Sequence, residues 1–232
     1  MVKRPVKLDS DFILLCGHYG TGKTNVTLNL ARDLRLKGRA VTVVDLDIVN
    51  PYFRSSDYKE QLDRWGVALQ APRFARSNVD LPALPPEIFS VMDKGREGTA
   101  LLDVGGDDAG AKVLGRMAER IRARRYEMLY VINKYRPMTG AAEQASDLLK
   151  EIETASRLSA TGIVNNSHLG ADTTVQTILD ALDFAKETSK ALALPLVATT
   201  VPRVLAEELA GRVEHMYPMD VLVTTPWAGS TE

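Results

Sequence analysis

Short, continuous apolar runs alternate along the chain with longer segments of helical periodicity. Runs such as residues 12–16 and 99–104 do not alternate polar with apolar positions, which is typical of strands buried on both faces of a sheet. Runs of this kind separated by helix-length segments predict a parallel sheet with helices on both faces. The predicted strands are residues 12–16, 40–45, 99–104, 128–133, 160–165, 194–198 and 221–224.

The segments between these runs have apolar residues three and four positions apart, as in amphipathic helices. In the first, Val26 and Leu30 share a face, and Gly38 is well placed to end the helix. A later helix is predicted over residues 175–185, with Asp172 as its N-cap. These elements predict a doubly wound, mainly parallel α/β sheet whose strand-end loops lie along one edge.

One stretch, at about residues 50–93, breaks this rhythm. It is rich in Pro, Arg and Asp, and residues 81–86 contain three prolines, which a regular helix does not tolerate. A chain of 232 residues fits one large α/β domain, so we expect a single domain over residues 1–232 with this stretch as an irregular excursion. The excursion either carries functional or partner contacts or covers the edge of the sheet.

The first predicted strand leads directly into a phosphate-binding motif. Residues 17–24 read Gly-His-Tyr-Gly-Thr-Gly-Lys-Thr and match the P-loop pattern G-x-x-x-x-G-K-[ST] in full. Glycine lets the backbone approach an anion, and the start of the following helix supplies free N–H groups and a favourable dipole. We expect Lys23 to reach the β- and γ-phosphates and Thr24 to hold Mg²⁺ through its hydroxyl. The residues expected to bind the nucleotide here are Gly17, Tyr19, Gly20, Thr21, Gly22, Lys23, Thr24 and Asn25.

Carboxylates at the ends of two predicted strands extend this site. Asp103 ends an apolar run and precedes two glycines, as expected for a Walker B acid that supports Mg²⁺ ahead of a mobile loop. Asp45 closes the second strand, where a carboxylate can face Mg²⁺ or orient the attacking water. Asp47 either shares that role or is an exposed turn acid. We therefore expect Thr24, Asp45 and Asp103 to hold the metal, and Lys23 and Asp45 to act in catalysis.

Composition limits the function classes. The formal net charge of −1 argues against a whole-surface attraction to nucleic acid or anionic lipid. The basic run from Arg116 to Arg125 is interpreted as a solvated helix face, because Glu119 interrupts it. Cys16 is the single cysteine, so no intrachain disulfide can form, which favours a reducing compartment. No run approaches the roughly 20 apolar residues of a membrane span. We expect a soluble, cytoplasmic protein.

The P-loop, the Asp45 segment and the Asp103 segment occur in an order that carries a family resemblance. With them the chain resembles the CobQ/CobB/MinD/ParA group of P-loop ATPases, in particular its ParA/MinD branch, over about residues 12–224. Residues 45–51 look like the Walker A′ motif of that family, and residues 103–106 look like its Walker B and switch II. The chain is similar, more closely, to a bacterial subgroup with G-H-Y-G-[ST]-G-K-T, D-x-D-x-x-N-P-Y-F-R and D-V-G-G-D-D segments. The resemblance implies a SIMIBI-like fold, binding of ATP and ADP, and slow hydrolysis.

One departure from the family pattern bears on partners. ParA/MinD proteins carry a second lysine near the start of the P-loop, which reaches across a dimer interface to the nucleotide of the partner. Here that position is His18, followed by Tyr19 where the family has glycine. Whether ATP drives a homodimer, or a protein client completes the site, is left open. Arg54 either supplies the missing positive charge or is a solvated loop arginine.

The base-reading segment favours adenine. A guanine-specific site commonly uses Asn-Lys-x-Asp, and the nearest match, residues 133–136, ends in Arg136 instead. In the ParA/MinD family an Asn after the next strand contacts adenine, which corresponds to Asn165 or Asn166 here. The loop after the following strand, with Pro202, would pack on the base. Local turn capping is the alternative for both asparagines.

The sequence therefore predicts an Mg²⁺-dependent ATP-binding protein that hydrolyses ATP slowly and acts as a nucleotide-dependent regulatory switch. Two alternatives are kept. A small-molecule kinase or ligase, similar to dethiobiotin synthetase, would need an acceptor pocket that the excursion could provide. A non-catalytic nucleotide-binding scaffold would bind ATP without hydrolysing it.

Overall fold

The computed structural model describes residues 9–47, 54–71, 86–92, 97–106, 108–137 and 139–223. Within these ranges eight strands form one parallel sheet in the order β3-β2-β4-β1-β5-β6-β7-β8. The strands are β1 Phe12–Cys16, β2 Val41–Leu46, β3 Ala68–Gln70, β4 Thr99–Val104, β5 Tyr126–Ile132, β6 Gly162–Asn165, β7 Leu196–Pro202 and β8 Met216–Met219.

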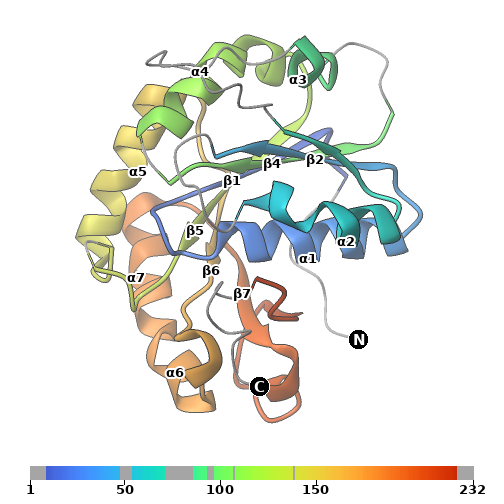
Figure 1. Ribbon diagram of the computed structural model, residues 1–232. Coiled ribbons are helices and arrows are strands. Elements are labelled where there is room, and N and C mark those ends of the chain that lie inside the picture. Colours follow the sequence, from blue (N-terminus) through green and yellow to red (C-terminus); the bar gives the residue numbers. More distant parts are fainter. Residues whose placement is uncertain are drawn as a thin grey trace.

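Helices cover both faces of this sheet (Figure 1). On one face lie α3, α4, α5 and α7, and on the other lie α1 and α2. The predicted doubly wound α/β fold is therefore confirmed. The helices are α1 Lys23–Leu36, α2 Lys59–Arg64, α3 Pro86–Ser90, α4 Asp108–Arg122, α5 Ala142–Ser156, α6 Val175–Asp180 and α7 Leu182–Leu192, with 3₁₀ turns at Ser55–Tyr58, Gly170–Asp172 and Arg203–Leu205.

The central strand β1 is apolar throughout because it is covered on both sides. Its residues Phe12 and Leu14 belong to the core beneath α4, α5 and α7, whereas Ile13 and Leu15 belong to the core beneath α1. Successive side chains of a strand point to opposite faces, so a strand buried on both faces needs no polar positions. All five residues of β1 are buried.

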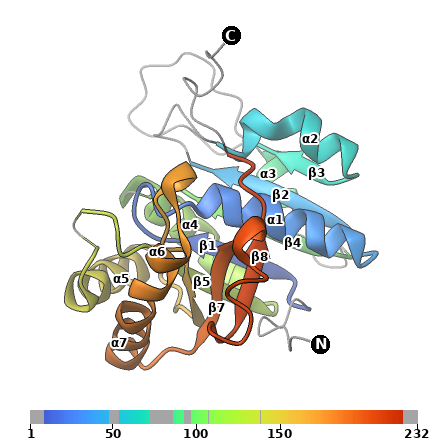
Figure 2. The same cartoon turned by 90° about the horizontal axis from the view of Figure 1, so that it is seen from below.

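The last strand differs from the prediction. The expected strand at residues 221–224 is wrong: β8 is Met216–Met219, and residues 221–223 have no regular structure. Residue 224 lies outside the described residues. Val221 is exposed, whereas Leu222 and Val223 pack against the core beneath α1, in a segment that runs alongside that helix (Figure 2). Their apolar character therefore reflects packing rather than strand pairing.

Two further elements also differ from expectation. The excursion contains the edge strand β3, which pairs with β2; residues 48–53, 72–85 and 93–96 of that region lie outside the described residues. The helix expected over residues 175–185 is two helices, α6 and α7, which meet at Ala181. The N-cap of α6 is Thr174, whose hydroxyl accepts from the Thr177 N–H at 3.2 Å, and Asp172 lies in the preceding turn.

The topology gathers the sequence motifs at one edge of the sheet. The strand β1 lies between β4 and β5, and the loops after all three strands leave at their carboxyl ends. From β1 the chain continues to strands on one side of it and later to strands on the other side, so the strand order reverses here. In open α/β sheets, ligands bind in the crevice at the carboxyl ends of the strands where the order reverses. No helix in the described part of the chain is long and apolar enough to cross a membrane.

Candidate functional site

The P-loop turns from β1 into α1 through glycines in left-handed conformations. Gly22 has φ +84°, and a Cβ built on it would lie 2.3 Å from Asn166 Nδ2. A side chain there would be strained and would collide with Asn166 of the loop after β6, so only glycine fits. Gly17 is equally constrained, since its Cβ would lie 2.4 Å from the Val131 carbonyl oxygen.

Lys23 is held at the centre of this loop. Its Nζ donates to the carbonyl oxygen of Gly17 at 2.9 Å and to that of His18 at 3.1 Å. The side chain is 7% exposed. A cation held by neutral carbonyls at the amino end of a helix makes an electropositive position suited to a phosphate.

Thr24, the next residue, joins the P-loop to the end of β4. Its hydroxyl donates to Asp103 Oδ2 at 2.8 Å. The hydroxyl of Ser55 donates to the same carboxylate oxygen. The 3₁₀ turn after β2 thus closes over the site, although no sequence motif singled out Ser55.

Asp45 lies directly beside Asp103, because the two are paired residues of the neighbouring strands β2 and β4. Its Oδ1 accepts from the Asp47 N–H and its Oδ2 accepts from the Ser56 N–H, both at 3.0 Å. Both Asp45 and Asp103 are 1% exposed. The site therefore holds two buried carboxylates side by side, with main-chain and hydroxyl donors around them.

The electrostatics of this carboxylate pair favour a cation. Burial, followed by the negative charge of Asp45, raises the pKa of Asp103 to about 7, and Lys23 opposes the shift. Burial likewise raises the pKa of Asp45. Carboxylate and hydroxyl oxygens are the ligands that Mg²⁺ prefers, and Mg²⁺ is usually held by one or two carboxylates plus waters and phosphates. The donor set formed by Thr24, Asp45 and Asp103 fits that ion.

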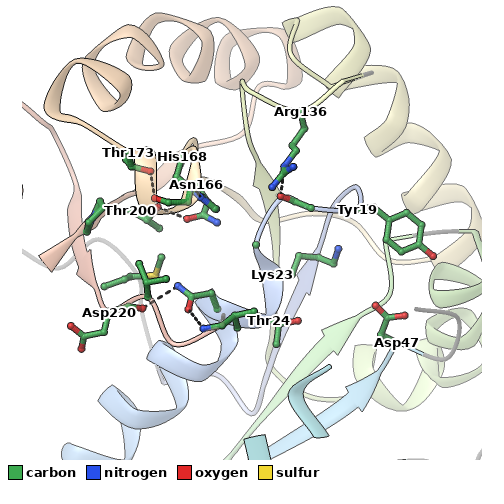
Figure 3. Close-up of a pocket in the computed structure, with 18 residues that line it drawn as sticks. Tyr19, Lys23, Thr24, Asp47, Arg136, Asn166, His168, Thr173, Thr200 and Asp220 are labelled. Atoms are coloured by element: carbon green, nitrogen blue, oxygen red, sulfur yellow. Dashed lines mark hydrogen bonds between the residues drawn. The ribbon is translucent and has the colours of Figure 1, made fainter. Parts of the chain in front are cut away.

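A cavity extends from the P-loop across the carboxyl ends of β6, β7 and β8 (Figure 3). Lys23 and Thr24 line it near the P-loop, and Asn166, Pro202 and Val221 line the other side. Figure 3 shows Tyr19 and Asp47 on the side away from Asn166. The cavity thus has one end rich in phosphate-binding groups and a second end of mixed polar and apolar character.

The two asparagines after β6 have different positions. Asn166 lines the cavity; its Nδ2 donates to the Thr21 carbonyl at 2.6 Å, and its Oδ1 accepts from the Thr200 hydroxyl at 2.5 Å. Asn165 is buried behind it and does not line the cavity. Its Oδ1 instead accepts from the hydroxyl of Ser167 at 2.6 Å.

Asn25 lines the cavity and also shapes it. Its Oδ1 accepts from the N–H groups of Leu222 at 2.8 Å and Val223 at 3.2 Å, and its Nδ2 donates to the Asp220 carbonyl at 3.1 Å. Residues 220–223, which we call the 220–223 segment, form part of the cavity wall. The helix that begins at the P-loop therefore positions the opposite wall.

Arg136 and His168 are among the cavity residues that the sequence analysis did not single out as binding candidates. Arg136 donates from Nε to the Gly20 carbonyl at 2.7 Å, so the loop after β5 contacts the P-loop. His168 lies beside Gly22, whose built Cβ would be 3.1 Å from its Nε2. Arg136 could have been noticed in the sequence, because residues 133–136 align with the guanine-reading segment Asn-Lys-x-Asp and Arg136 stands at its last position. Arg54, by contrast, does not line the described cavity.

Comparison with solved structures gives the same fold at low sequence identity. The signal recognition particle 54 kDa protein of Aeropyrum pernix K1, solved in complex with GDP, matches with TM-score 0.55 and 17% identity, covering 85% of this chain and 43% of that one. FtsY of Mycoplasma mycoides matches with TM-score 0.54 and 16% identity, over 84% of this chain and 62% of that one. The cell division protein FtsY of Thermotoga maritima has TM-score 0.53 and 17% identity, over 82% and 61%.

This chain thus spans less than two thirds of the length of these proteins. No curated protein is a significant match to it. The sequence profile of the CobQ/CobB/MinD/ParA nucleotide binding domain, however, matches residues 14–176, which include the P-loop, both aspartates and both asparagines after β6. With that match over more than half of its length, the chain belongs to the CobQ/CobB/MinD/ParA nucleotide-binding family.

Proposed function

We propose that this nucleotide-binding P-loop domain binds ATP with Mg²⁺, hydrolyses it slowly and acts as a nucleotide-dependent switch. One observation carries the proposal. Lys23 at the centre of the P-loop, and the Thr24 hydroxyl bonded to the Asp103 carboxylate, lie at the same end of one cavity. This end combines a cation for phosphate with oxygen ligands for a metal ion.

The roles of the residues follow from this arrangement. The Lys23 ammonium and the P-loop amides would take the charge that develops on the transferred phosphoryl group. Thr24, Asp103 and Asp45 would hold Mg²⁺, which when bound neutralises negative charge on the β- and γ-phosphates. Asp45, a strand neighbour of Asp103, would also orient the attacking water. Gly17, Tyr19, Gly20, Thr21 and Gly22 would surround the phosphates.

Two observations support adenine over guanine. Arg136 stands where a guanine-reading carboxylate would be in an Asn-Lys-x-Asp segment. Asp220 is a carboxylate of the cavity wall, but Arg203 binds its Oδ1 at 2.8 Å and Arg32 binds its Oδ2 at 2.6 Å. Each carboxylate oxygen that would accept from the guanine edge already has a cationic donor. Asn166 and Pro202, which line the cavity, are proposed to contact the base.

Hydrolysis is tested by measuring phosphate release in a single turnover, with protein in excess over ATP. The wild type should release phosphate with Mg²⁺ and not with EDTA. Asp45→Asn should still bind ATP but release phosphate at least about tenfold more slowly, because it loses the water-orienting charge. Asp147→Asn, which removes an exposed carboxylate from α5, is the control and should match the wild type. Tight ATP binding without any Mg²⁺-dependent release would favour the non-catalytic scaffold.

The switch itself is tested by the oligomeric state. We propose that the ATP-bound form associates with a second copy or with a protein client. Light scattering with and without a non-hydrolysable ATP analogue should show an increase in mass. If the partner is a second copy, the protein alone shows the increase; if it is a protein client, the increase needs the client. The switch would be contradicted if the protein keeps the mass of a monomer both with and without the analogue. This result must also hold after addition of cell-extract fractions that stimulate turnover, because such fractions would contain the client.

A further inference from the structure

The loop after β6 places a histidine in the cavity wall next to the P-loop. His168 is half-buried, lines the cavity and lies close to Gly22. Figure 3 shows it in a group with Asn166, Thr173 and Thr200, on the side of the cavity away from Tyr19 and Asp47. This position lies between the phosphate end and the wall formed by the loops after β7 and β8.

The hydrogen bonding of the ring defines which nitrogen carries the proton. The Gly170 N–H donates to His168 Nδ1 at 3.0 Å, so Nδ1 acts as the acceptor. Burial, together with the positive charge of Arg136, lowers the pKa of His168 to about 4, so the ring is neutral at pH 7. A neutral imidazole has a single N–H, which must then be on Nε2. His168 therefore presents a fixed Nε2–H donor.

The neighbouring polar side chains are already engaged with the protein. Both the oxygen and the nitrogen of the Asn166 side chain have partners, in Thr200 and Thr21. The Thr173 hydroxyl donates to the Gly170 carbonyl at 2.7 Å and accepts from a main-chain N–H. Within the described ranges, no hydrogen bond involves His168 Nε2, which makes it an unused donor of this wall.

We propose that the Nε2–H of His168 donates a hydrogen bond to an acceptor atom of the bound nucleoside and is a specificity-determining contact of this site. The acceptor is a ring nitrogen of the purine or an oxygen of the ribose. The inference rests on the proposed function, because Lys23 and the P-loop must hold the triphosphate in the same cavity. The triphosphate itself has the P-loop amides and Lys23 as donors, which leaves the His168 donor for the nucleoside.

The test separates the nucleoside from the phosphates by comparing ATP with inorganic tripolyphosphate. His168→Phe keeps a planar ring but has no donor, whereas His168→Gln places an amide nitrogen near the position of Nε2. A net contribution of about 1 kcal/mol for a neutral hydrogen bond corresponds to about a fivefold change in affinity. We expect His168→Phe to weaken ATP binding about three- to tenfold, His168→Gln to restore most of it, and neither variant to change tripolyphosphate binding.

Two nucleotide analogues identify the acceptor. If it is the purine N7, 7-deaza-ATP should bind wild type and His168→Phe equally well. If it is the ribose 2′-oxygen, 2′-deoxy-ATP should do so instead. Either result supports the proposal, because in each case one nucleoside atom accounts for the effect of the substitution.

Other outcomes overturn the proposal. Unchanged ATP affinity in His168→Phe would show that the donor is not used, and equal weakening of ATP and tripolyphosphate would assign it to the phosphates. The urea midpoint of each variant shows whether it is folded. Failure of the wild type to bind either ATP or tripolyphosphate would instead contradict the proposed function. The two failures are therefore distinguishable.

Discussion

Asn29 of α1 fixes the wall of the cavity beside the P-loop, the proposed nucleotide site, so its removal should lower both stability and nucleotide affinity. The side chain is fully buried. Its Nδ2 donates to the Asp220 carbonyl at 2.9 Å, and its Oδ1 accepts from the Asp220 N–H at 3.0 Å. The same side chain also binds Asn25, which holds the rest of the 220–223 segment. Asn29→Ala deletes this pair of main-chain contacts in one step.

The size of the effect follows from the bonds that are lost. Each of the two bonds to Asp220 contributes about 1 kcal/mol net, and a buried main-chain group left without a partner adds about 1 kcal/mol or more. Asn25 still binds the Asp220 carbonyl, so the N–H is the group that loses its partner. The ion pairs of Asp220 with Arg32 and Arg203 are partly exposed and compensate little. We expect the free energy of unfolding to fall by about 3 kcal/mol.

Urea unfolding of wild type and Asn29→Ala measures this difference, and ATP titration measures its consequence for the site. We expect roughly tenfold weaker ATP binding, because the 220–223 segment lines the cavity, with tripolyphosphate binding unchanged. Tyr217→Phe is the control: it removes a hydroxyl that donates to Asp33 at 3.1 Å and should cost less than about 1 kcal/mol. A loss below about 1 kcal/mol in Asn29→Ala, or unchanged ATP affinity, would refute the reasoning.

Three other predictions use single substitutions. Gly22→Ala should lose nucleotide binding and about 2 kcal/mol or more of stability, because its Cβ would meet Asn166 at 2.3 Å; Gly38→Ala, at a similar φ of +79° with open space around it, should lose only about 1 kcal/mol in urea unfolding. The part of the wild type's stability that is lost as the pH falls from about 6.5 towards 4 should be retained by His168→Gln, because glutamine does not titrate. That part is at most about 3 kcal/mol, because the folded state resists protonation of His168 more than the unfolded chain does; urea unfolding at pH 7 and pH 4.5 measures it. Asp103→Asn removes one of two adjacent buried charges and keeps a carbonyl oxygen for both hydroxyl donors. In urea unfolding at pH 8, the metal-free variant should therefore be at least as stable as the metal-free wild type. Calorimetry of the variant should show no enhancement of ATP binding by Mg²⁺.

Much of the fold was predictable because its signals are local. The apolar run of β1, the P-loop and the amphipathic α1 are consecutive in the sequence. Once the P-loop motif is recognised, the strand before it and the helix after it can be placed. The edge strand β3 was missed because it has only three residues, none of them fully buried, and a short edge strand leaves no strong pattern. The misplacement of β8 has a related cause. Met216–Met219 is mostly half-buried and contains Pro218, whereas the apolar residues Leu222 and Val223 pack on the core beneath α1 without pairing.

The candidate site was predictable to the extent that its residues belong to motifs. Lys23, Thr24 and Asp103 follow from spacing, and the structure brings the latter two into contact. The contacts of His168 and Arg136 arise from tertiary packing. The Arg136–Gly20 bond, for example, spans 116 residues of sequence. The tautomer of His168 depends on a main-chain N–H two residues further on, which no residue pattern specifies.

The central claim, that Lys23 and the P-loop hold the triphosphate of ATP, is tested most directly by calorimetric titration of wild type and Lys23→Ala with ATP in the presence of Mg²⁺. The wild type should bind one ATP per chain. Lys23→Ala should bind at least about tenfold more weakly, because a charge-assisted hydrogen bond contributes about 1.5–3 kcal/mol. Tighter binding of GTP than of ATP would contradict only the adenine assignment. Equal affinities of the two proteins for ATP, or no binding by either, would contradict the account.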